Sequence, residues 1–202
     1  MSENFWDMHM ENDENAARYM ETYGEGAGSD TRKVIASFIK DGESVLDVGC
    51  GPGWNLDHFQ QFGPKIRGYR GLDYSERFVR VANKRHNKDH NQRFRVGDCR
   101  ELKEPKRSWD VVILQDVLEY VPGYEKPVLE ALRVARKRVI ITFWHLTEND
   151  DHINDDGNDG WGAWYSKPKW EEFLNSLNIK WTHIKSEPDA NRQHDFYVLE
   201  AK

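Results

Sequence analysis

The chain has 202 residues, of which 38% are hydrophobic and 32% are charged, and its formal net charge is −6. This length suits one domain with a substantial buried core, and the negative charge argues against non-specific nucleic-acid binding, which needs a surplus of Lys and Arg. The sequence lacks an apolar run near the ~20 residues that span a bilayer, and its acidic start lacks the basic and apolar regions of a signal peptide. We therefore expect a cytoplasmic protein without a membrane segment.

Short apolar runs alternate with segments of helical periodicity from about residue 30 onward. This alternation is typical of βαβ units and of a mainly parallel sheet. The predicted strands cover residues 44–48, 69–73, 94–96, 109–114 and 138–144. The predicted helices cover residues 31–39, 54–62, 75–86, 124–135 and 169–177. Residues 180–185 and 196–201 alternate like an antiparallel pair of strands, an ending that differs from the further parallel βα units of a dinucleotide-binding sheet.

Residues 1–202 are expected to form a single domain with two segments outside its regular elements. Residues 1–30 form a predicted N-terminal cap, which could contain one or two amphipathic helices. Residues 145–166 are rich in Asp, Asn and Gly, and we predict an acidic and aromatic lid loop there, because loops of that length in a compact domain are often functional. Residues 150–160 have the composition of a calcium loop but do not fit the EF-hand pattern, so we predict no metal site.

The strongest chemical motif is VLDVGCGPG, at residues 45–53. A buried strand leads into a turn whose glycines let the backbone approach a ligand closely, and the helix that follows offers its N–H groups. In a nicotinamide-dinucleotide site the third glycine would come one residue later, and the carboxylate of Asp47 would repel the pyrophosphate. A carboxylate instead suits a ligand that carries an ammonium and a sulfonium group. The predicted ligand-binding residues are Asp47, Gly49, Cys50 and Gly51.

Two further acidic motifs follow the next two strands. Asp73 lies in GLDYS, about 20 residues after the glycine loop, where a carboxylate can accept hydrogen bonds from both ribose hydroxyls of an adenosine. Its alternative role is to cap the next helix, a role that Ser75 can fill. Asp98 lies in VGDC, where it can accept a hydrogen bond from the adenine amine while the N–H of Cys99 donates to a ring nitrogen, although Gly-Asp alone also makes an ordinary turn. Tyr74 and Cys99 belong to the predicted cofactor site.

These motifs closely resemble those of the class I S-adenosylmethionine-dependent methyltransferases. VLDVGCGPG resembles their first motif, GLDYS their ribose-binding motif, GDC their adenine-binding motif, and WDVVILQDVLEYVP, at residues 109–122, the motif of their fourth strand. The resemblance implies an α/β fold, a Rossmann-like three-layer sandwich with a seven-stranded, mostly parallel sheet and a final antiparallel strand. It implies S-adenosylmethionine as cofactor and S-adenosylhomocysteine as product. By the same resemblance, Asp47 and Gly49 would lie near the methionine moiety, Gly51 beside the cofactor and Gln115 at its sulfonium end.

The sequence departs from this family in two places. The Pro-Gly-Gly turn that the family often has before its fifth strand is replaced by Ala135-Arg136-Lys137-Arg138. The histidine that often follows Leu-Glu in the family is Tyr120 here, so no proton-transfer role of that histidine carries over to this chain.

The methyl acceptor has to be inferred from the two outlying segments, because the family builds its acceptor site there. His145 follows the predicted fifth strand and is the candidate catalytic base; its alternative role is that of a surface or hydrogen-bonded loop histidine. Acidic and aromatic side chains suit a cationic or aromatic small-molecule acceptor through charge and cation–π contacts, or else the aromatic rings clamp both segments to the core. These aromatic residues are Trp6, Tyr19, Tyr23, Trp144, Trp161, Trp164 and Tyr165. Tyr23 is also included in the predicted cofactor site.

Three other functions are compatible with the sequence. A protein or RNA methyltransferase could dock its substrate on the basic stretch 65–107, although no separate recognition domain is predicted. A cofactor-binding protein without catalysis would keep the same motifs, since binding and turnover are separable. A nicotinamide oxidoreductase would require the glycine loop to hold a pyrophosphate.

Overall fold

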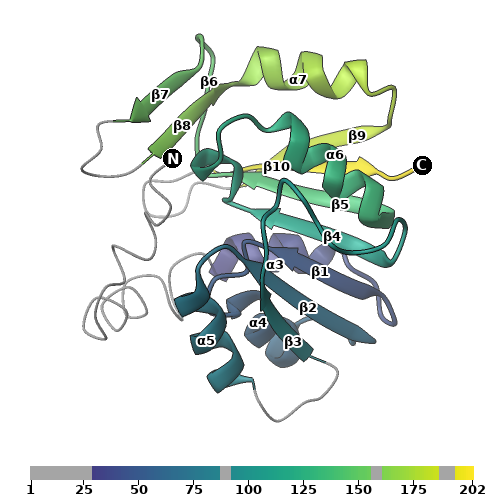
Figure 1. Cartoon of the computed structure of the whole chain (residues 1–202). Helices are drawn as coiled ribbons and strands as arrows, with labels where there is room; N and C mark the ends of the chain where they lie inside the picture. The colour runs from purple at the N-terminus through teal and green to yellow at the C-terminus, as the bar shows by residue number, and fades with distance from the viewer. Residues whose placement is uncertain (1–28, 87–91, 156–160, 187–193) are drawn as a thin grey trace.

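The computed structural model describes residues 29–86, 92–155, 161–186 and 194–202. Its main strands are β1 (Ser44–Val48), β2 (Gly68–Asp73), β3 (Gln92–Val96), β4 (Trp109–Gln115), β5 (Ala135–Phe143), β9 (Trp181–Lys185) and β10 (Asp195–Glu200). They form one seven-stranded sheet in the order β3-β2-β1-β4-β5-β10-β9 (Figure 1). Strands β1 to β5 run parallel, whereas β10 is antiparallel to both β5 and β9. The predicted mostly parallel sheet with a final antiparallel strand is confirmed.

The helices form one layer on each face of this sheet. They are α3 (Ser29–Ser37), α4 (Trp54–Phe62), α5 (Glu76–Arg85), α6 (Glu125–Val134) and α7 (Lys167–Ser176), with the short 3₁₀ helix η1 (Leu118–Tyr120) after β4. Successive residues of a strand point to opposite faces. Val45 accordingly packs with residues of α3, α4 and α5, whereas its neighbour Leu46 packs with residues of α6 and α7. Both faces of the sheet are therefore covered, and the predicted three-layer α/β sandwich is confirmed.

Local capping signals fix where two of the helices begin. The hydroxyl of Ser75 accepts a hydrogen bond from the N–H of Phe78 at 3.3 Å at the start of α5. The hydroxyl of Ser166 accepts one from the N–H of Lys169 at 3.5 Å at the start of α7. Pro168 fits the first turn of α7 because its missing N–H needs no partner there. Helix α7 consequently begins before the first residue of its predicted range.

Residues 145–166 differ from the loop that the sequence predicts. Their described part contains the strands β6 (Leu146–Thr147), β7 (His152–Asp155) and β8 (Trp161–Ser166), which form a small sheet in the order β6-β8-β7. The high Asp, Asn and Gly content of the segment is typical of loops, so the sequence analysis did not predict these strands. The hydroxyl of Tyr165 donates to the carbonyl of Val121 at 2.5 Å and accepts from the N–H of Gly123 at 2.9 Å. The buried side chain of Tyr165 therefore fastens β8 to the segment after η1, which agrees with the alternative role of clamping this region to the core.

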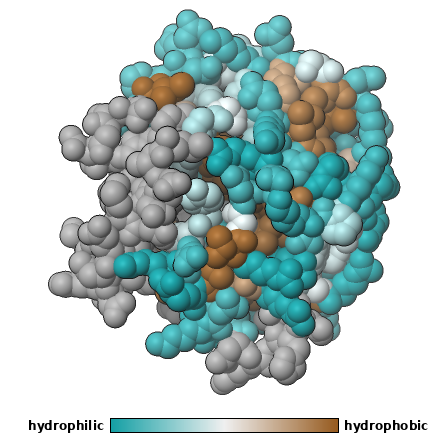
Figure 2. Space-filling view, viewed as in Figure 1, coloured by the Kyte–Doolittle hydropathy of each residue, from teal (hydrophilic) through white to brown (hydrophobic). Residues whose placement is uncertain are grey.

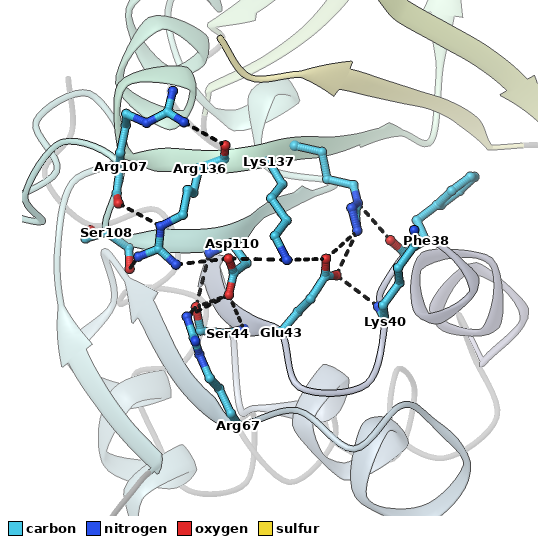
Figure 3. Close-up of polar contacts among 11 residues, drawn as sticks. Phe38, Lys40, Glu43, Ser44, Arg67, Arg107, Ser108, Asp110, Arg136 and Lys137 are labelled. Carbon is cyan, nitrogen blue, oxygen red and sulfur yellow. Dashed lines mark hydrogen bonds and ion pairs between the residues drawn. The ribbon is translucent and has the colours of Figure 1, made fainter.

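Charged side chains crowd the amino edge of the main sheet, where β1, β4 and β5 begin (Figure 3). Asp110 accepts a hydrogen bond from Arg136 at 2.9 Å. Glu43 accepts hydrogen bonds from Arg138 at 2.7 Å and from Lys137 at 3.1 Å. The basic run that replaces the family's Pro-Gly-Gly turn thus supplies the cations that neutralise two buried carboxylates.

The face of the molecule shown in Figure 2 is mainly hydrophilic and carries several separate hydrophobic groups, one of which lies where α6 and α7 meet. At this junction the ring of Tyr124, at the start of α6, lies 5.1 Å from that of Trp170 and 5.3 Å from that of Phe173. Within the described parts of the chain, no helix combines the length and apolar character needed to cross a membrane.

Candidate functional site

Four neighbouring strands end side by side at the carboxyl edge of the main sheet. Val48 of β1 is in register with Leu72 of β2 and with Leu114 of β4. Asp73 of β2 is in register with Val96 of β3. Ligands of open α/β sheets bind in the crevice outside the carboxyl ends of the strands. The fold therefore brings the glycine loop and the motifs that follow β2, β3 and β4 to the edge where such ligands bind.

The loop between β1 and α4 has the backbone conformation that its glycines predict. Gly49 and Gly51 have φ angles of 74° and 51°, which residues with a Cβ rarely adopt. The N–H groups of Gly49 and Cys50 donate to the carbonyl of Leu72 at 2.7 and 3.0 Å and fasten the loop to β2. A Cβ added to Gly49 would clash with Val117, whereas one added to Gly51 would have no described atom within 4 Å. A ligand can therefore approach the backbone at Gly51.

Asp73 joins the glycine loop to the end of β2. Its Oδ2 accepts a hydrogen bond from the N–H of Gly51 at 2.8 Å, and its Oδ1 accepts one from the N–H of Ser75 at 2.9 Å. Asp73 is buried, whereas the next residue, Tyr74, is 54% exposed. Because Ser75 caps α5, Asp73 is not needed as the cap. These contacts unite the first two motifs and fix the direction of the Asp73 carboxylate.

Asp47 is fully buried near the end of β1. Its Oδ2 accepts hydrogen bonds from the hydroxyl of Tyr69 at 2.5 Å and from the amide of Asn55 at 3.1 Å, while its Oδ1 has no hydrogen-bond partner among the described residues. Burial raises the pKa of Asp47 to about 6, although those hydrogen bonds and the charge of Arg32 lower it. A buried carboxylate that ionises near neutral pH is stabilised by a cationic ligand. Tyr69 and Asn55 are partners that sequence reasoning missed.

In the third motif, VGDC, the carboxylate of Asp98 is held by Arg100, two residues further along the chain. Asp98 accepts hydrogen bonds from the backbone N–H of Arg100 at 2.8 Å and from its guanidinium at 2.6 Å. The hydrogen bond from this guanidinium lowers the pKa of Asp98. Arg100 thus occupies part of the carboxylate that we predict to accept the adenine amine. Burial raises the pKa of the Cys99 thiol to about 12 and that of the Cys50 thiol well above its usual value, so neither thiol is a nucleophile at neutral pH.

The chain turns sharply at the end of β4, where Gln115 is followed by Asp116. Asp116 has a φ of 53°, a left-handed conformation that few residues other than Gly, Asn and Asp adopt. Its Oδ1 accepts a hydrogen bond from the hydroxyl of Thr142 at 2.6 Å, and its Oδ2 lies 3.4 Å from Nε2 of His194. Glu119, in η1, is 1% exposed. Sequence reasoning missed Asp116, Glu119, Thr142 and His194, although both acids lie in the motif WDVVILQDVLEYVP.

His145 lies on the surface formed by the small sheet. It is exposed, and with Thr147, His152 and Trp164 it lines a shallow depression of about 260 Å³. The ring of Trp144 lies 6.1 Å from that of His145. The role of His145 as a base stays a prediction. Tyr23 lies outside the described residues.

Residues 39–180 match the sequence model of a methyltransferase domain. The chain belongs to the methyltransferase domain family. This membership confirms the predicted family and its S-adenosylmethionine cofactor. A sterol 24-C-methyltransferase of Aspergillus fumigatus is 31% identical to this methyltransferase domain over 119 residues, which cover 58% of this chain and 31% of that protein. A demethylmenaquinone methyltransferase of Listeria welshimeri is 32% identical over 101 residues, which cover 48% of this chain and 42% of that protein.

The chain thus spans less than half the length of these two curated relatives. Among solved structures, the fold is similar to that of phosphoethanolamine N-methyltransferase 2 from Haemonchus contortus, in complex with phosphomonomethylethanolamine and S-adenosylhomocysteine. The TM-score is 0.79 at 16% identity, and the alignment covers 98% of this chain and 59% of that one. At this level of identity the similarity supports the fold of the methyltransferase domain and nothing finer.

Three features of the carboxyl edge fit S-adenosylmethionine. Oδ1 of Asp47 has no described hydrogen-bond partner, and a cationic ligand could satisfy it. The space beside Gly51 lets a ligand approach the loop backbone. The carboxylate of Asp73 is fixed at the end of β2, where the acidic residue of nucleotide-binding sheets contacts the ribose.

Asp47→Asn tests the cost of the buried charge. The ordinary pKa of an Asp is 3.8, whereas that of Asp47 in the fold is about 6, so the stability contributed by its proton is complete below pH 3.8 and is lost as the pH rises through about 6. This shift corresponds to about 3 kcal/mol. We expect Asp47→Asn to be more stable than the wild type by about 1–3 kcal/mol at pH 7.5 and similarly stable at pH 4, as measured by urea unfolding.

The control for this pH comparison is Asp150→Asn, because the side chain of Asp150 is 92% exposed. It should follow the wild type within about 0.5 kcal/mol at both pH values. If the difference between Asp47→Asn and the wild type does not grow between pH 4 and pH 7.5, the pKa of Asp47 is not raised.

Proposed function

We propose that this methyltransferase domain transfers the methyl group of S-adenosylmethionine to a small-molecule acceptor that carries an amine or an aromatic group. The observation that carries the proposal is the 2.8 Å hydrogen bond from the N–H of Gly51 to Asp73, because it joins the glycine loop and the ribose-binding motif in one site. The sulfonium of the bound cofactor supplies a methyl group that is already activated for displacement. The residues of the chain then have to bind both reactants, align them and exclude water.

We assign the cofactor to the carboxyl edge of the sheet. Asp73 accepts the ribose hydroxyls, Asp47 lies toward the methionine moiety, and Gln115 lies at the sulfonium end. Because the Cβ that Gly71 lacks would lie 2.7 Å from Sγ of Cys50, the thiol packs against β2 and Cys50 presents its backbone to the cofactor. The proposed cofactor residues are Asp47, Gly49, Cys50, Gly51, Asp73, Tyr74, Asp98, Cys99 and Gln115.

Two observations support a small-molecule acceptor with an amine or aromatic group. The matched relatives are named for a sterol and for demethylmenaquinone, which are both small molecules. The small sheet, which follows β5, presents aromatic side chains: the ring of Trp164 lies 6.3 Å from that of Trp144 and 5.1 Å from that of His152. Such surfaces bind flat or cationic groups. We propose that this segment flanks the acceptor.

Methylation of a protein or an RNA is the alternative, and the charges of the stretch 65–107 argue against it. Its arginines include members of ion pairs with carboxylates: Arg67 with Asp110, Arg70 with Glu104, Arg85 with Asp57, and Arg100 with Asp98. A cation that is already paired contributes little to binding an acidic partner. A cofactor-binding protein without catalysis is distinguished by screening amine, phenol and carboxylate acceptors for formation of S-adenosylhomocysteine.

Calorimetric titration with S-adenosylhomocysteine tests the proposed function. We expect the wild type to bind it with a dissociation constant in the micromolar range and to show no binding of NADH. In Asp73→Ala the affinity should fall by about 100-fold, because a buried carboxylate that accepts two hydroxyl groups contributes about 3 kcal/mol.

A matched control is Glu76→Ala, which removes a carboxylate that is 70% exposed at the start of α5. It should keep the affinity of the wild type within about twofold. Binding of NADH in place of S-adenosylhomocysteine, or an unchanged affinity in Asp73→Ala, would refute the assignment.

A further inference from the structure

Asp116 is held in a fixed direction at the carboxyl end of β4, directly after Gln115. The buried hydroxyl of Thr142 donates to its Oδ1 at 2.6 Å and accepts from its backbone N–H at 3.0 Å. The φ of 53° turns the residue out of the strand, and backbone strain of this kind is concentrated at functional sites. The side chain is 26% exposed, so a ligand can reach the carboxylate.

His194 reaches Asp116 from the start of β10. Its Nε2 lies 3.4 Å from Oδ2 of Asp116, and its Nδ1 lies 3.4 Å from the hydroxyl of Thr31 in α3. Its backbone N–H donates to the hydroxyl of Ser186 at 3.0 Å. The imidazole is therefore positioned by contacts with α3 and with the end of β4. It limits the movement of Oδ2 of Asp116, just as Thr142 limits that of Oδ1.

Glu119 provides an independent sign that a ligand belongs here. It is 1% exposed, its Oε1 accepts a hydrogen bond from the N–H of Trp144 at 2.8 Å, and its Oε2 has no hydrogen-bond partner among the described residues. Burial, and after it the charge of Asp116, raises the pKa of Glu119. A buried polar atom without a partner costs free energy unless a ligand or water satisfies it.

The carboxylates at the two edges of the sheet differ in the charge of their partners. At the amino edge, Glu43 and Asp110 each lie within ion-pair distance of at least two cations. At the carboxyl edge, Asp47 and Oδ1 of Asp116 accept hydrogen bonds from neutral hydroxyl and amide groups. In the described part of the chain, His194 is the one basic side chain within ion-pair distance of Asp116. This local excess of negative charge favours a cation.

We infer that Asp116 binds the ammonium group of an amine acceptor, in a subsite completed by Glu119 and positioned by His194. The inference rests on the proposed function and names the acceptor class and its anchoring residue. A carboxylate oxygen accepts more than one hydrogen bond, so an ammonium can donate to Asp116 while Thr142 keeps its contact. Asp116 directly follows Gln115, the residue proposed at the sulfonium end, which would place the acceptor nitrogen beside the methyl group. The bound ammonium would first give a proton to the Asp116 carboxylate, so that the nitrogen lone pair could form the N–C bond while the S–C bond breaks and S-adenosylhomocysteine leaves.

The test compares two probes of equal size on the full-length protein saturated with S-adenosylhomocysteine. At pH 7.5 benzylamine is a cation and benzyl alcohol is neutral. We expect the wild type to bind benzylamine at least about tenfold more tightly than benzyl alcohol, since a hydrogen bond to a charged group is worth about that factor. In Asp116→Asn, which tolerates the left-handed backbone, this preference should disappear. Its affinities for benzyl alcohol and S-adenosylhomocysteine should stay within about twofold of the wild-type values.

Asp150→Asn is the matched control, because it removes the same charge from a side chain that is 92% exposed; it should keep the preference for the amine. Equal binding of the two probes by the wild type, or binding of neither, would overturn the inference. So would a loss of S-adenosylhomocysteine affinity in Asp116→Asn, because that result would place Asp116 in the cofactor site. Failure of the wild type to bind S-adenosylhomocysteine contradicts the proposed function itself, so the two failures can be told apart.

Discussion

Replacing Gly49 by alanine is expected to destabilise the fold by about 3 kcal/mol or more. Gly49 has a φ of 74°, where a Cβ alone costs about 1–2 kcal/mol. The added Cβ would lie closer than 3.0 Å to Cγ2 of Val117 and 3.3 Å from its Cβ and Cγ1. Val117 is stiff because it is branched at Cβ, and it packs against the core on the α6 and α7 face. Neither partner can move aside cheaply, and urea unfolding should report the loss.

Two companion variants separate the steric clash from the backbone cost. Val117→Ala in the Gly49→Ala background removes the overlapping methyl groups, so the pair should be less destabilising than the sum of the single changes by about 1–2 kcal/mol. Gly51→Ala has no described atom within 4 Å of its new Cβ, so it should lose only about 1–2 kcal/mol while its affinity for S-adenosylhomocysteine falls. Equal destabilisation by Gly49→Ala and Gly51→Ala would contradict the clash.

The sequence was sufficient for those parts of the fold whose signals are local. The buried run of β1 and the glycines after it fix the first strand, its loop and the start of α4. Because parallel strands end at the same edge of a sheet, the order of strands and motifs along the chain is enough to place the motifs that follow β1, β2 and β3 together. The capping role of Ser75 was also readable, and the structure confirms it.

The remaining features depend on contacts between segments that lie far apart in the chain. His194 meets Asp116 only because β10 inserts between β5 and β9, which no local pattern indicates. From the sequence, Tyr69 is an ordinary core residue of β2. Only the pairing of β2 with β1 brings its hydroxyl within hydrogen-bond distance of Asp47. The sequence analysis missed the small sheet because its strands are defined by the pairing of β6 and β7 with β8, whereas the composition of the segment is typical of a loop. Periodicity and motifs therefore predict the elements, but they do not predict which distant segments of the chain pair with one another.

Asp110→Ala is expected to destabilise the fold by about 2–4 kcal/mol, because the N–H and hydroxyl of Ser44 lose a buried, charged hydrogen-bond acceptor. The side chain of Asp110 is 4% exposed. It accepts hydrogen bonds from the N–H and hydroxyl of Ser44 at 3.0 and 3.1 Å and from Arg136 at 2.9 Å (Figure 3). Arg67 is 55% exposed where it pairs with the same carboxylate, so Arg67→Gln should cost at most about 1 kcal/mol. Urea unfolding of both variants at pH 7 checks this order.

Asp110 should also affect how the free energy of unfolding of the protein changes at low pH. Burial alone would raise the pKa of Asp110, but hydrogen bonds from Ser44 and Arg136 and the charge of Arg67 lower it from 3.8 to about 2. Its contribution to stability is therefore complete above pH 3.8 and is lost as the pH falls through about 2. The shift corresponds to about 2 kcal/mol, so between pH 4 and pH 2 the wild type should lose that much stability relative to Asp110→Asn, which has no proton to gain. If urea unfolding shows both proteins declining in parallel, the acid sensitivity belongs to other carboxylates and the network does not hold Asp110 in its charged form.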